Sequence, residues 1–180
     1  HAYVTGFDDD AVSWYDRNAS TGALNYGGVL KDGVGGVDGL NGALGITISA
    51  DGKHAYAAGY NDSAVSWYER NASTGGLTYG GVLKDGVGGV DGLDAARGVT
   101  TSADGKHIYV SSWFDHALSW YERNASTGAL TYRGIHKNGG NGVDGLNGAY
   151  CVVLSADGNH AYVTGALDDS LTWYERNAST

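Results

Sequence analysis

The sequence predicts an all-β fold, a β-propeller built from four-stranded antiparallel blades of 53 residues each, and about three and a half blades in this chain. The first observation is a segment, 66–75, that recurs along the chain without insertion or deletion. The second is that each repeat holds four short alternating or β-branched stretches separated by Gly, Asn and Asp, with no helical period. Such a repeat is typical of a propeller blade. The recurring tryptophans, spaced by 53 residues, are Trp14, Trp67, Trp120 and Trp173.

The second repeat shows how each strand is predicted. Asp51-Gly52 lies between two β-branched or alternating runs and is a strong signal for a hairpin. The stretch 64–70 is apolar on both faces, so both faces must be covered by neighbouring blades. Asn71 to Gly75 has the composition of a turn. The predicted strands, named a to d in chain order, are 45–49, 54–59, 64–70 and 77–83.

The strand count predicts how the repeats are divided. Strands b and c occur four times, whereas a and d occur three times, so the first blade lacks its innermost strand and the last lacks its outermost. We expect the four tryptophans to be buried between blades. The predicted units are an incomplete blade b-c-d at 1–41, full blades at 42–94 and 95–147, and an incomplete blade a-b-c at 148–180.

An array of this length cannot close a ring, because propellers have about four to eight blades. Open ends would expose strand edges and apolar blade faces. We therefore expect either self-association into a homo-oligomer through the terminal blades or a place in a longer chain. The chain has no methionine and opens on a histidine, which predicts that it is not a complete primary translation product.

Composition excludes several classes of partner. The formal net charge of −9 argues against nucleic acid, because phosphate contacts need clustered Lys and Arg. No apolar run approaches about 18 residues, so no membrane span is expected. The single cysteine, Cys151, cannot form an internal disulfide and is expected to be a small buried residue.

Acidic residues give the one candidate metal site. In a propeller the b-to-c turns and the d-to-a linkers share one face, and carboxylates gathered there could bind a hard cation such as calcium. The stretch 139–146 fits a calcium-binding G-G-x-G-x-D-x-U pattern. The alternative, which we favour, is that Asp occurs in turns because it bonds the local backbone. We expect no cofactor, with calcium as the alternative, at Asp38, Asp91 and Asp144.

Two further repeated positions have structural explanations. Asn18, Asn71, Asn124 and Asn177 each begin a glycosylation sequon, but the same residues suit a c-to-d turn. One histidine opens each strand b, which indicates packing or hairpin hydrogen bonding. No Ser-His-Asp or Cys-His set can be assembled, because near-identical blades do not bring different catalytic groups to one centre. These histidines are His1, His54, His107 and His160.

The blade pattern resembles that of lactonase-like, seven-bladed propellers. The resemblance rests on segments 49–56, 64–68 and 73–78 and spans the whole chain. It implies the propeller fold and a lactone-hydrolysing site at the central opening, although the family's catalytic residues have no identifiable counterpart among these motifs. Alanine stands where that family typically has proline, at Ala50, Ala103 and Ala156.

Two functions follow as expectations. The first is a non-catalytic extracellular scaffold, secreted or at the cell surface, for recognition or assembly with a glycan or protein ligand. The second is a lactonase-like hydrolase with its site at the central opening. Because the repeats are nearly identical and catalysis needs different groups at one centre, the sequence favours the first and a protein that is not an enzyme.

Overall fold

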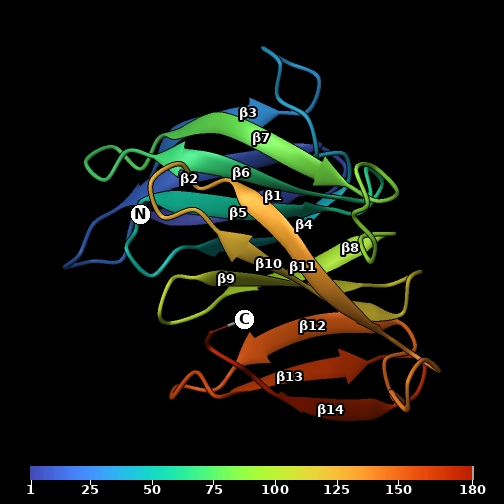
Figure 1. Cartoon of the computed structure of the whole chain (residues 1–180). Coiled ribbons are helices and arrows are strands. Elements are labelled where there is room, and N and C mark those ends of the chain that lie inside the picture. The colour runs from blue at the N-terminus through green and yellow to red at the C-terminus, as the bar shows by residue number, and fades with distance from the viewer. Residues whose placement is uncertain (180) are drawn as a thin grey trace.

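The computed structural model describes residues 1–179 and contains fourteen strands in four antiparallel sheets (Figure 1). The first sheet holds β1 (Ala2–Gly6), β2 (Ala11–Arg17) and β3 (Leu24–Lys31). The second holds β4 (Ala43–Ile48), β5 (His54–Gly59), β6 (Ala64–Arg70) and β7 (Leu77–Lys84). The third holds β8 (Ala96–Thr101), β9 (His107–Ser112), β10 (Ala117–Arg123) and β11 (Leu130–Lys137). The fourth holds β12 (Ala149–Leu154), β13 (His160–Gly165) and β14 (Ser170–Glu175).

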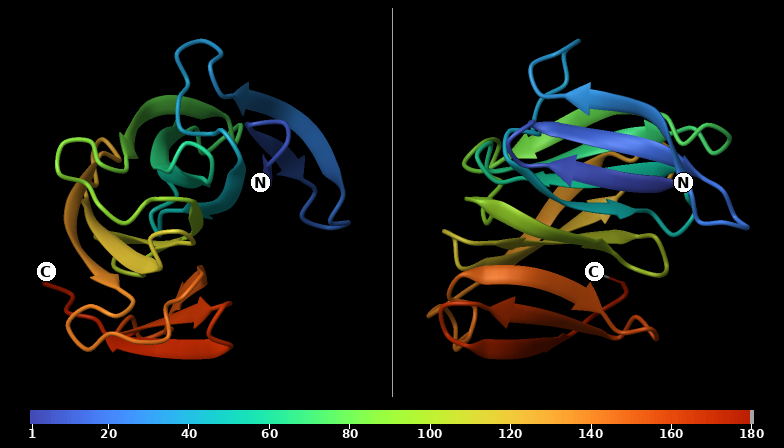
Figure 2. Two further views of the ribbon diagram at one scale, coloured as in Figure 1. Left: turned by 90° about the vertical axis from the view of Figure 1, so that its right-hand side faces the viewer. Right: turned by 180° about the vertical axis from the view of Figure 1, so that it is seen from behind.

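The sheets follow one another in an arc in chain order (Figure 2, left). Within each sheet, strands that are consecutive in sequence pair with each other, and β4, β8 and β12 lie next to one another on the inside of the arc. The first sheet lacks the inner strand and the last lacks the outer one, as expected. The all-β propeller fold is confirmed, while the residue limits of the blades stay a prediction. No helix in the described part of the chain could span a membrane.

Side chains that bond the local backbone form the turns. Asp51 Oδ1 accepts hydrogen bonds from Ser49 Oγ at 2.6 Å and from the Lys53 backbone N–H at 3.1 Å, which closes the a-to-b hairpin. In the c-to-d turn, Asn71 Oδ1 accepts the N–H groups of Ser73 and Thr74 at 2.9 and 3.1 Å. The structural explanation of the repeated asparagines is therefore confirmed.

The core lies between neighbouring sheets, and its largest side chains are tyrosines rather than tryptophans. Tyr68 and its counterpart Tyr121 are fully buried. The prediction of buried tryptophans is wrong: Trp67 is half-buried, and its ring lies against Gly80, where an added Cβ would be 2.6 Å from the indole. Trp173 is 64% exposed, because no outer strand pairs with β14 in the described residues.

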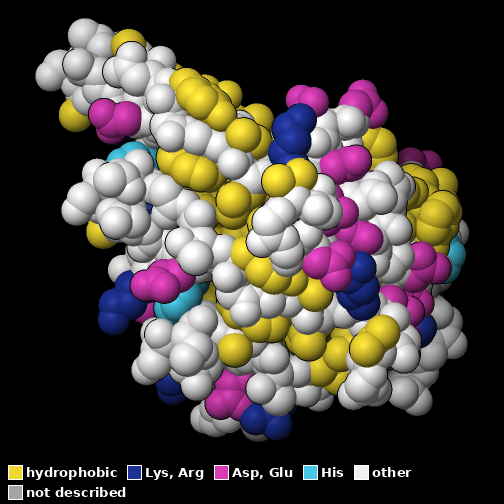
Figure 3. Space-filling model, turned by 90° about the horizontal axis from the view of Figure 1, so that it is seen from above, with side chains coloured by type: hydrophobic (Ala, Val, Ile, Leu, Met, Phe, Trp, Pro, Cys, Tyr) yellow, Lys and Arg dark blue, Asp and Glu magenta, His cyan; other side chains and the backbone are white. Residues whose placement is uncertain are grey.

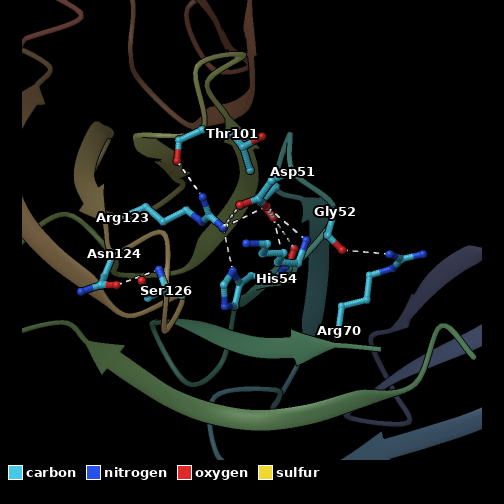
Figure 4. A network of polar contacts seen from close by, with 12 residues as sticks. Asp51, Gly52, His54, Arg70, Thr101, Arg123, Asn124 and Ser126 are labelled. Atoms are coloured by element: carbon cyan, nitrogen blue, oxygen red, sulfur yellow. Dashed lines mark hydrogen bonds and ion pairs between the residues drawn. The ribbon is translucent and has the colours of Figure 1, made fainter. Parts of the chain in front are cut away.

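A repeated contact, which we call the arginine joint, connects each sheet to the next. Arg123, at the end of β10, is buried and reaches back to the preceding sheet, where its Nε donates to the Tyr56 hydroxyl at 2.8 Å. Its Nη2 lies 2.9 Å from Asp51 Oδ2 and 2.7 Å from His54 Nδ1. Figure 4 shows Arg123 pointing toward Asp51 and His54. Arg176 makes the equivalent contacts with Tyr109, His107 and Asp104. Arg70 contacts Tyr3 and His1 in the same way.

The arginine joint also sets the charge states around it. Burial opposes a charged carboxylate, but hydrogen bonds from Ser49 and Arg123 lower the pKa of Asp51 well below its usual range. Burial and the nearby guanidinium both lower the pKa of His54. His1, His54 and His107 each contact the arginine of the next sheet, in agreement with the packing or hydrogen-bonding role expected from the sequence.

Candidate functional site

Two of the three predicted metal ligands lie in clusters of carboxylates. Oxygen atoms of Asp38, Asp32 and Asp62 lie within 4.8 Å of one another, and those of Asp91, Asp85 and Asp115 do the same. These clusters form where a d-to-a linker meets the next b-to-c turn, as expected. Acidic side chains gather mainly on the right of Figure 3, with basic ones among them.

Each of these two clusters already contains a cation and backbone donors. Lys84 Nζ lies 2.8 Å from Asp38 Oδ1 and 3.4 Å from Asp62 Oδ1, and the bond to Asp38 raises the pKa of Lys84. Asp32 Oδ1 accepts the Leu40 N–H at 3.0 Å, which fixes the linker. The lysine and the backbone thus supply the positive partners that these carboxylates need.

The third predicted ligand has different surroundings. Asp144 accepts the N–H of its own neighbour Gly145 at 2.9 Å, and Asn138 stands where the other linkers have aspartate. Asp38, Asp91 and Asp144 lie on three separate linkers rather than around one point. A calcium ion at any of them stays a prediction.

A different site lies on the inner strands, which line a shallow hollow facing the centre of the arc. Here the repeats differ: the same position carries Leu44 in β4, Arg97 in β8 and Tyr150 in β12. At the next repeat position β4 and β8 carry Gly45 and Gly98, whereas β12 carries Cys151. Cys151 is exposed, so the expectation that it is buried is wrong. Among the described residues, β8 lies on one side of Cys151 and no inner strand lies on the other.

Arg97 is the cation of this hollow. Its guanidinium carbon lies 3.6 Å from the centroid of the Tyr150 ring and 5.5 Å from that of Trp113. The two rings meet edge to face, 6.2 Å apart. Among residues 1–179, no carboxylate is within ion-pair distance of Arg97. The rings hold the guanidinium by cation–π contacts and leave its N–H donors for another partner.

Aromatic side chains of the b-to-c turns extend this surface along the rim. Phe7 and Tyr60 have ring centroids 6.0 Å apart, and Tyr60 and Phe114 are 5.9 Å apart. Phe7 is 41% and Phe114 57% exposed. Aromatic rings from three successive blades therefore follow one another along this rim, and the exposed rings of Phe7 and Phe114 offer apolar area to a ligand.

His116 connects this rim to the fourth sheet. It has a positive φ of 50°, and its Nδ1 accepts the Gly148 backbone N–H at 2.9 Å. Because Nδ1 is the acceptor, the proton of the neutral ring is on Nε2. At the same repeat position, Asp10 accepts the Gly42 N–H at 2.8 Å and Ser63 accepts the Ala95 N–H at 3.2 Å. The backbone contact is repeated, whereas the side chain that makes it differs in each blade.

The repeats thus diverge at the rim and remain the same at the opposite face, where the arginine joints lie. Sequence reasoning missed this site, because it treated the repeats as equivalent. The signal was present in the sequence: a comparison of Leu44, Arg97 and Tyr150, position by position, would have shown it. The different side chains required for a binding or catalytic centre lie at the inner rim.

Solved structures with this fold include several enzymes described as lactonases. A candidate 6-phosphogluconolactonase from Bacteroides uniformis is 18% identical, with 99% of this chain and 48% of that chain covered and a TM-score of 0.78. The periplasmic gluconolactonase of Pseudomonas aeruginosa is 21% identical, with 94% and 47% covered and a TM-score of 0.73. This chain thus spans about half the length of these proteins. No curated protein sequence matches it.

The sequence itself matches a family model. The model described as "Lactonase, 7-bladed beta-propeller" covers residues 1–143. Together with the lactonase names of the structural neighbours, this match contradicts the expectation of a non-catalytic scaffold. The physical argument for that expectation also fails, because the repeats are not equivalent where they face the centre. The chain belongs to the lactonase family of seven-bladed β-propellers.

Proposed function

We propose that this chain takes part in the hydrolysis of a lactone, with the site at the rim of the central opening. The observation that carries the proposal is Arg97, a cation without a carboxylate partner in the described residues, held between two aromatic rings where the repeats diverge. Two of the similar structures, named as a candidate 6-phosphogluconolactonase and a periplasmic gluconolactonase, support the same activity.

Lactone hydrolysis needs a donor for the carbonyl oxygen, because negative charge develops there when water attacks. Arg97 can fill this role: its guanidinium stays charged and presents several N–H donors in a fixed plane. The cation–π contacts with Tyr150 and Trp113 restrict its orientation before a ligand arrives.

The aromatic rim has a complementary role in binding. A sugar lactone has apolar C–H faces, and the exposed rings of Phe114 and Tyr150 offer flat apolar surface beside the arginine. This chain spans about half the length of the lactonase structures. In the proposed enzyme, blades beyond the four described here would complete the opening and supply the group that activates water.

The remaining expectations from the sequence are proposals of the same kind. A periplasmic relative supports a location outside the cytoplasm, secreted or at the cell surface. The ligand is a small lactone rather than the glycan or protein ligand first considered. Self-association through the terminal blades stays a prediction.

The proposed site is tested with the variant Arg97→Leu, which places in β8 the residue that β4 already carries at Leu44. Glucono-1,5-lactone and its 6-phosphate are the probes, with binding followed by tryptophan fluorescence and hydrolysis by proton release. The matched control is Arg133→Leu, which removes the same charge from the outer strand β11.

We expect Arg97→Leu to weaken binding of the probe by about tenfold or more, because a charged hydrogen bond contributes about 1.5–3 kcal/mol. The control is expected to bind as the unchanged protein does. No binding and no hydrolysis by the unchanged protein would refute the proposed function, and equal effects of the two substitutions would refute the role of Arg97.

A further inference from the structure

Arg97 is the extra residue of a β-bulge in the inner strand of the third sheet. On either side of it β8 pairs regularly with β9, and the partners are Ala96 with Ser112 and Gly98 with Ser111. Arg97 itself has no partner across the ladder. A bulge interrupts the alternation of side chains along a strand and re-aims one of them. Here the side chain that it re-aims is the cation of the hollow.

A hydrogen bond from one side chain holds this bulge. The backbone N–H of Gly98, the residue directly after Arg97, donates to Ser111 Oγ at 3.1 Å. Ser111 is fully buried and is not among the residues that line the hollow. The hydroxyl therefore acts on Arg97 through the backbone of β8 and not through contact with a ligand.

Tyr150, the stacking partner of Arg97, is held in the same way. It is the extra residue of a bulge in β12, since the pairing between β12 and β13 passes over it. The N–H of Cys151, the residue directly after Tyr150, donates to Thr164 Oγ1 at 3.2 Å. Thr164 occupies the repeat position of Ser111. Each partner of the cation–π contact is thus fixed by a hydroxyl from the adjacent strand.

The second sheet shows the same region without the hydroxyl. Ala58 stands at the position of Ser111, and two residues of β4 are unpaired there instead of one, Leu44 and Gly45. The first sheet has no inner strand among the described residues, so the comparison covers the other three. In these three, the hydroxyl is present where the inner strand brings an arginine or a tyrosine to the hollow and is missing where it brings a leucine.

The glycine at position 98 brings the two bulges together. A Cβ there would lie 3.1 Å from the carbonyl oxygen of Tyr150 and 3.2 Å from Cys151 Cα. The backbone of β12 therefore packs directly on β8 beside Arg97, whose guanidinium carbon lies 3.6 Å from the centroid of the Tyr150 ring. Because the contact is this close, a shift of the β8 backbone at Gly98 changes the stacking of Arg97 directly.

We propose that Ser111 is a positioning residue for Arg97: its hydroxyl fixes the bulge in β8 and thereby holds the guanidinium against Tyr150. Thr164 has the same role for Tyr150. The inference rests on the proposed function, in which Arg97 donates to the carbonyl oxygen of a lactone. A donor to developing charge is effective when it is held in place before the reaction, so the hydroxyl contributes to binding and turnover without touching the ligand.

The first test needs no ligand. Protons of Arg97 that lie over the Tyr150 ring have NMR chemical shifts displaced by the ring current, and this displacement reports the stacking. We expect Ser111→Ala, which introduces the residue that β5 carries at Ala58, to reduce the displacement. Ser111→Thr, which introduces the residue found at Thr164, is expected to keep it. The control Ser66→Ala removes another fully buried serine hydroxyl, in β6, and should leave the Arg97 signals unchanged.

The second test places the effect on Arg97. Ser111→Ala should weaken binding of glucono-1,5-lactone by about twofold to tenfold, the range that one neutral hydrogen bond spans. In the Arg97→Leu background the same substitution should have no effect, because the two residues act through one another.

Three results would overturn the proposal: unchanged Arg97 signals in Ser111→Ala, a Ser111→Thr variant that behaves like Ser111→Ala, or an equal loss of binding in both backgrounds. Failure of the proposed function gives a different result. If Ser111→Ala alters the Arg97 signals but the unchanged protein neither binds nor hydrolyses the lactone, the positioning of Arg97 by Ser111 is supported and the lactonase activity is refuted.

Discussion

The arginine joint should be a main source of cohesion between blades, and Arg123→Ala measures its contribution. Arg123 is 6% exposed, while the carboxylate side chain of Asp51 remains 34% exposed and keeps its bonds from Ser49 and Lys53. Removing one partner of a buried pair costs about 3–5 kcal/mol, and the partial exposure of Asp51 places this case at the lower end, about 3 kcal/mol. For a chain of this size, about 3 kcal/mol corresponds to a fall in Tm of roughly 6–12 °C.

The matched control is the same substitution at the counterpart position in the first sheet. Arg17 is exposed, so Arg17→Ala should change the free energy of unfolding by less than about 0.5 kcal/mol. Both variants are compared by thermal and urea unfolding at the same low protein concentration. If Arg123→Ala is no more destabilising than Arg17→Ala, the joint does not hold the blades together and the reasoning is refuted.

Two other perturbations follow from the titratable groups. Burial lowers the pKa of His136, so the unfolded chain takes up a proton first as the pH falls through about 6.5, and stability should decrease from pH 7 to 5. The variant His136→Leu introduces the residue that the other repeats carry at this position, Leu30 and Leu83. It should make the unfolding midpoint depend less on pH, and an unchanged dependence of the midpoint on pH would contradict this. A chelator should leave the midpoint unchanged, because the ammonium groups of Lys84 and Lys137 already bind the carboxylates of Asp38 and Asp91. A fall that calcium reverses, and that Asp91→Asn abolishes, would instead establish the calcium site.

The sequence predicted the fold because its strongest signals are local and repeated. Asp51-Gly52 and Asn71 specify turns through their own backbone bonds, and the constant spacing of the motifs makes each strand assignment confirm the others. The burial of Trp67 was predicted wrongly, because the alternation of side chains along a strand predicts only that a residue faces a neighbouring blade. Its depth depends on the outer strand, where Gly80 lets the ring lie near the surface.

The site could not be predicted in the same way, because it depends on long-range neighbours. The stacking of Arg97 on Tyr150 joins residues 53 positions apart, and nothing in the local sequence of either residue indicates it. The arginine joints likewise connect residues 67–72 positions apart, which explains why the repeated histidines were assigned a role without a partner. Only the arc of the sheets brings these pairs together.

The most direct test of this account is lactone hydrolysis by the protein, comparing Arg97→Leu with Arg133→Leu. The account predicts proton release from glucono-1,5-lactone or its 6-phosphate above the uncatalysed rate, with kcat/KM reduced by about tenfold or more in Arg97→Leu and unchanged in Arg133→Leu. The absence of both turnover and binding in the unchanged protein, or equal turnover in the two variants, would contradict it.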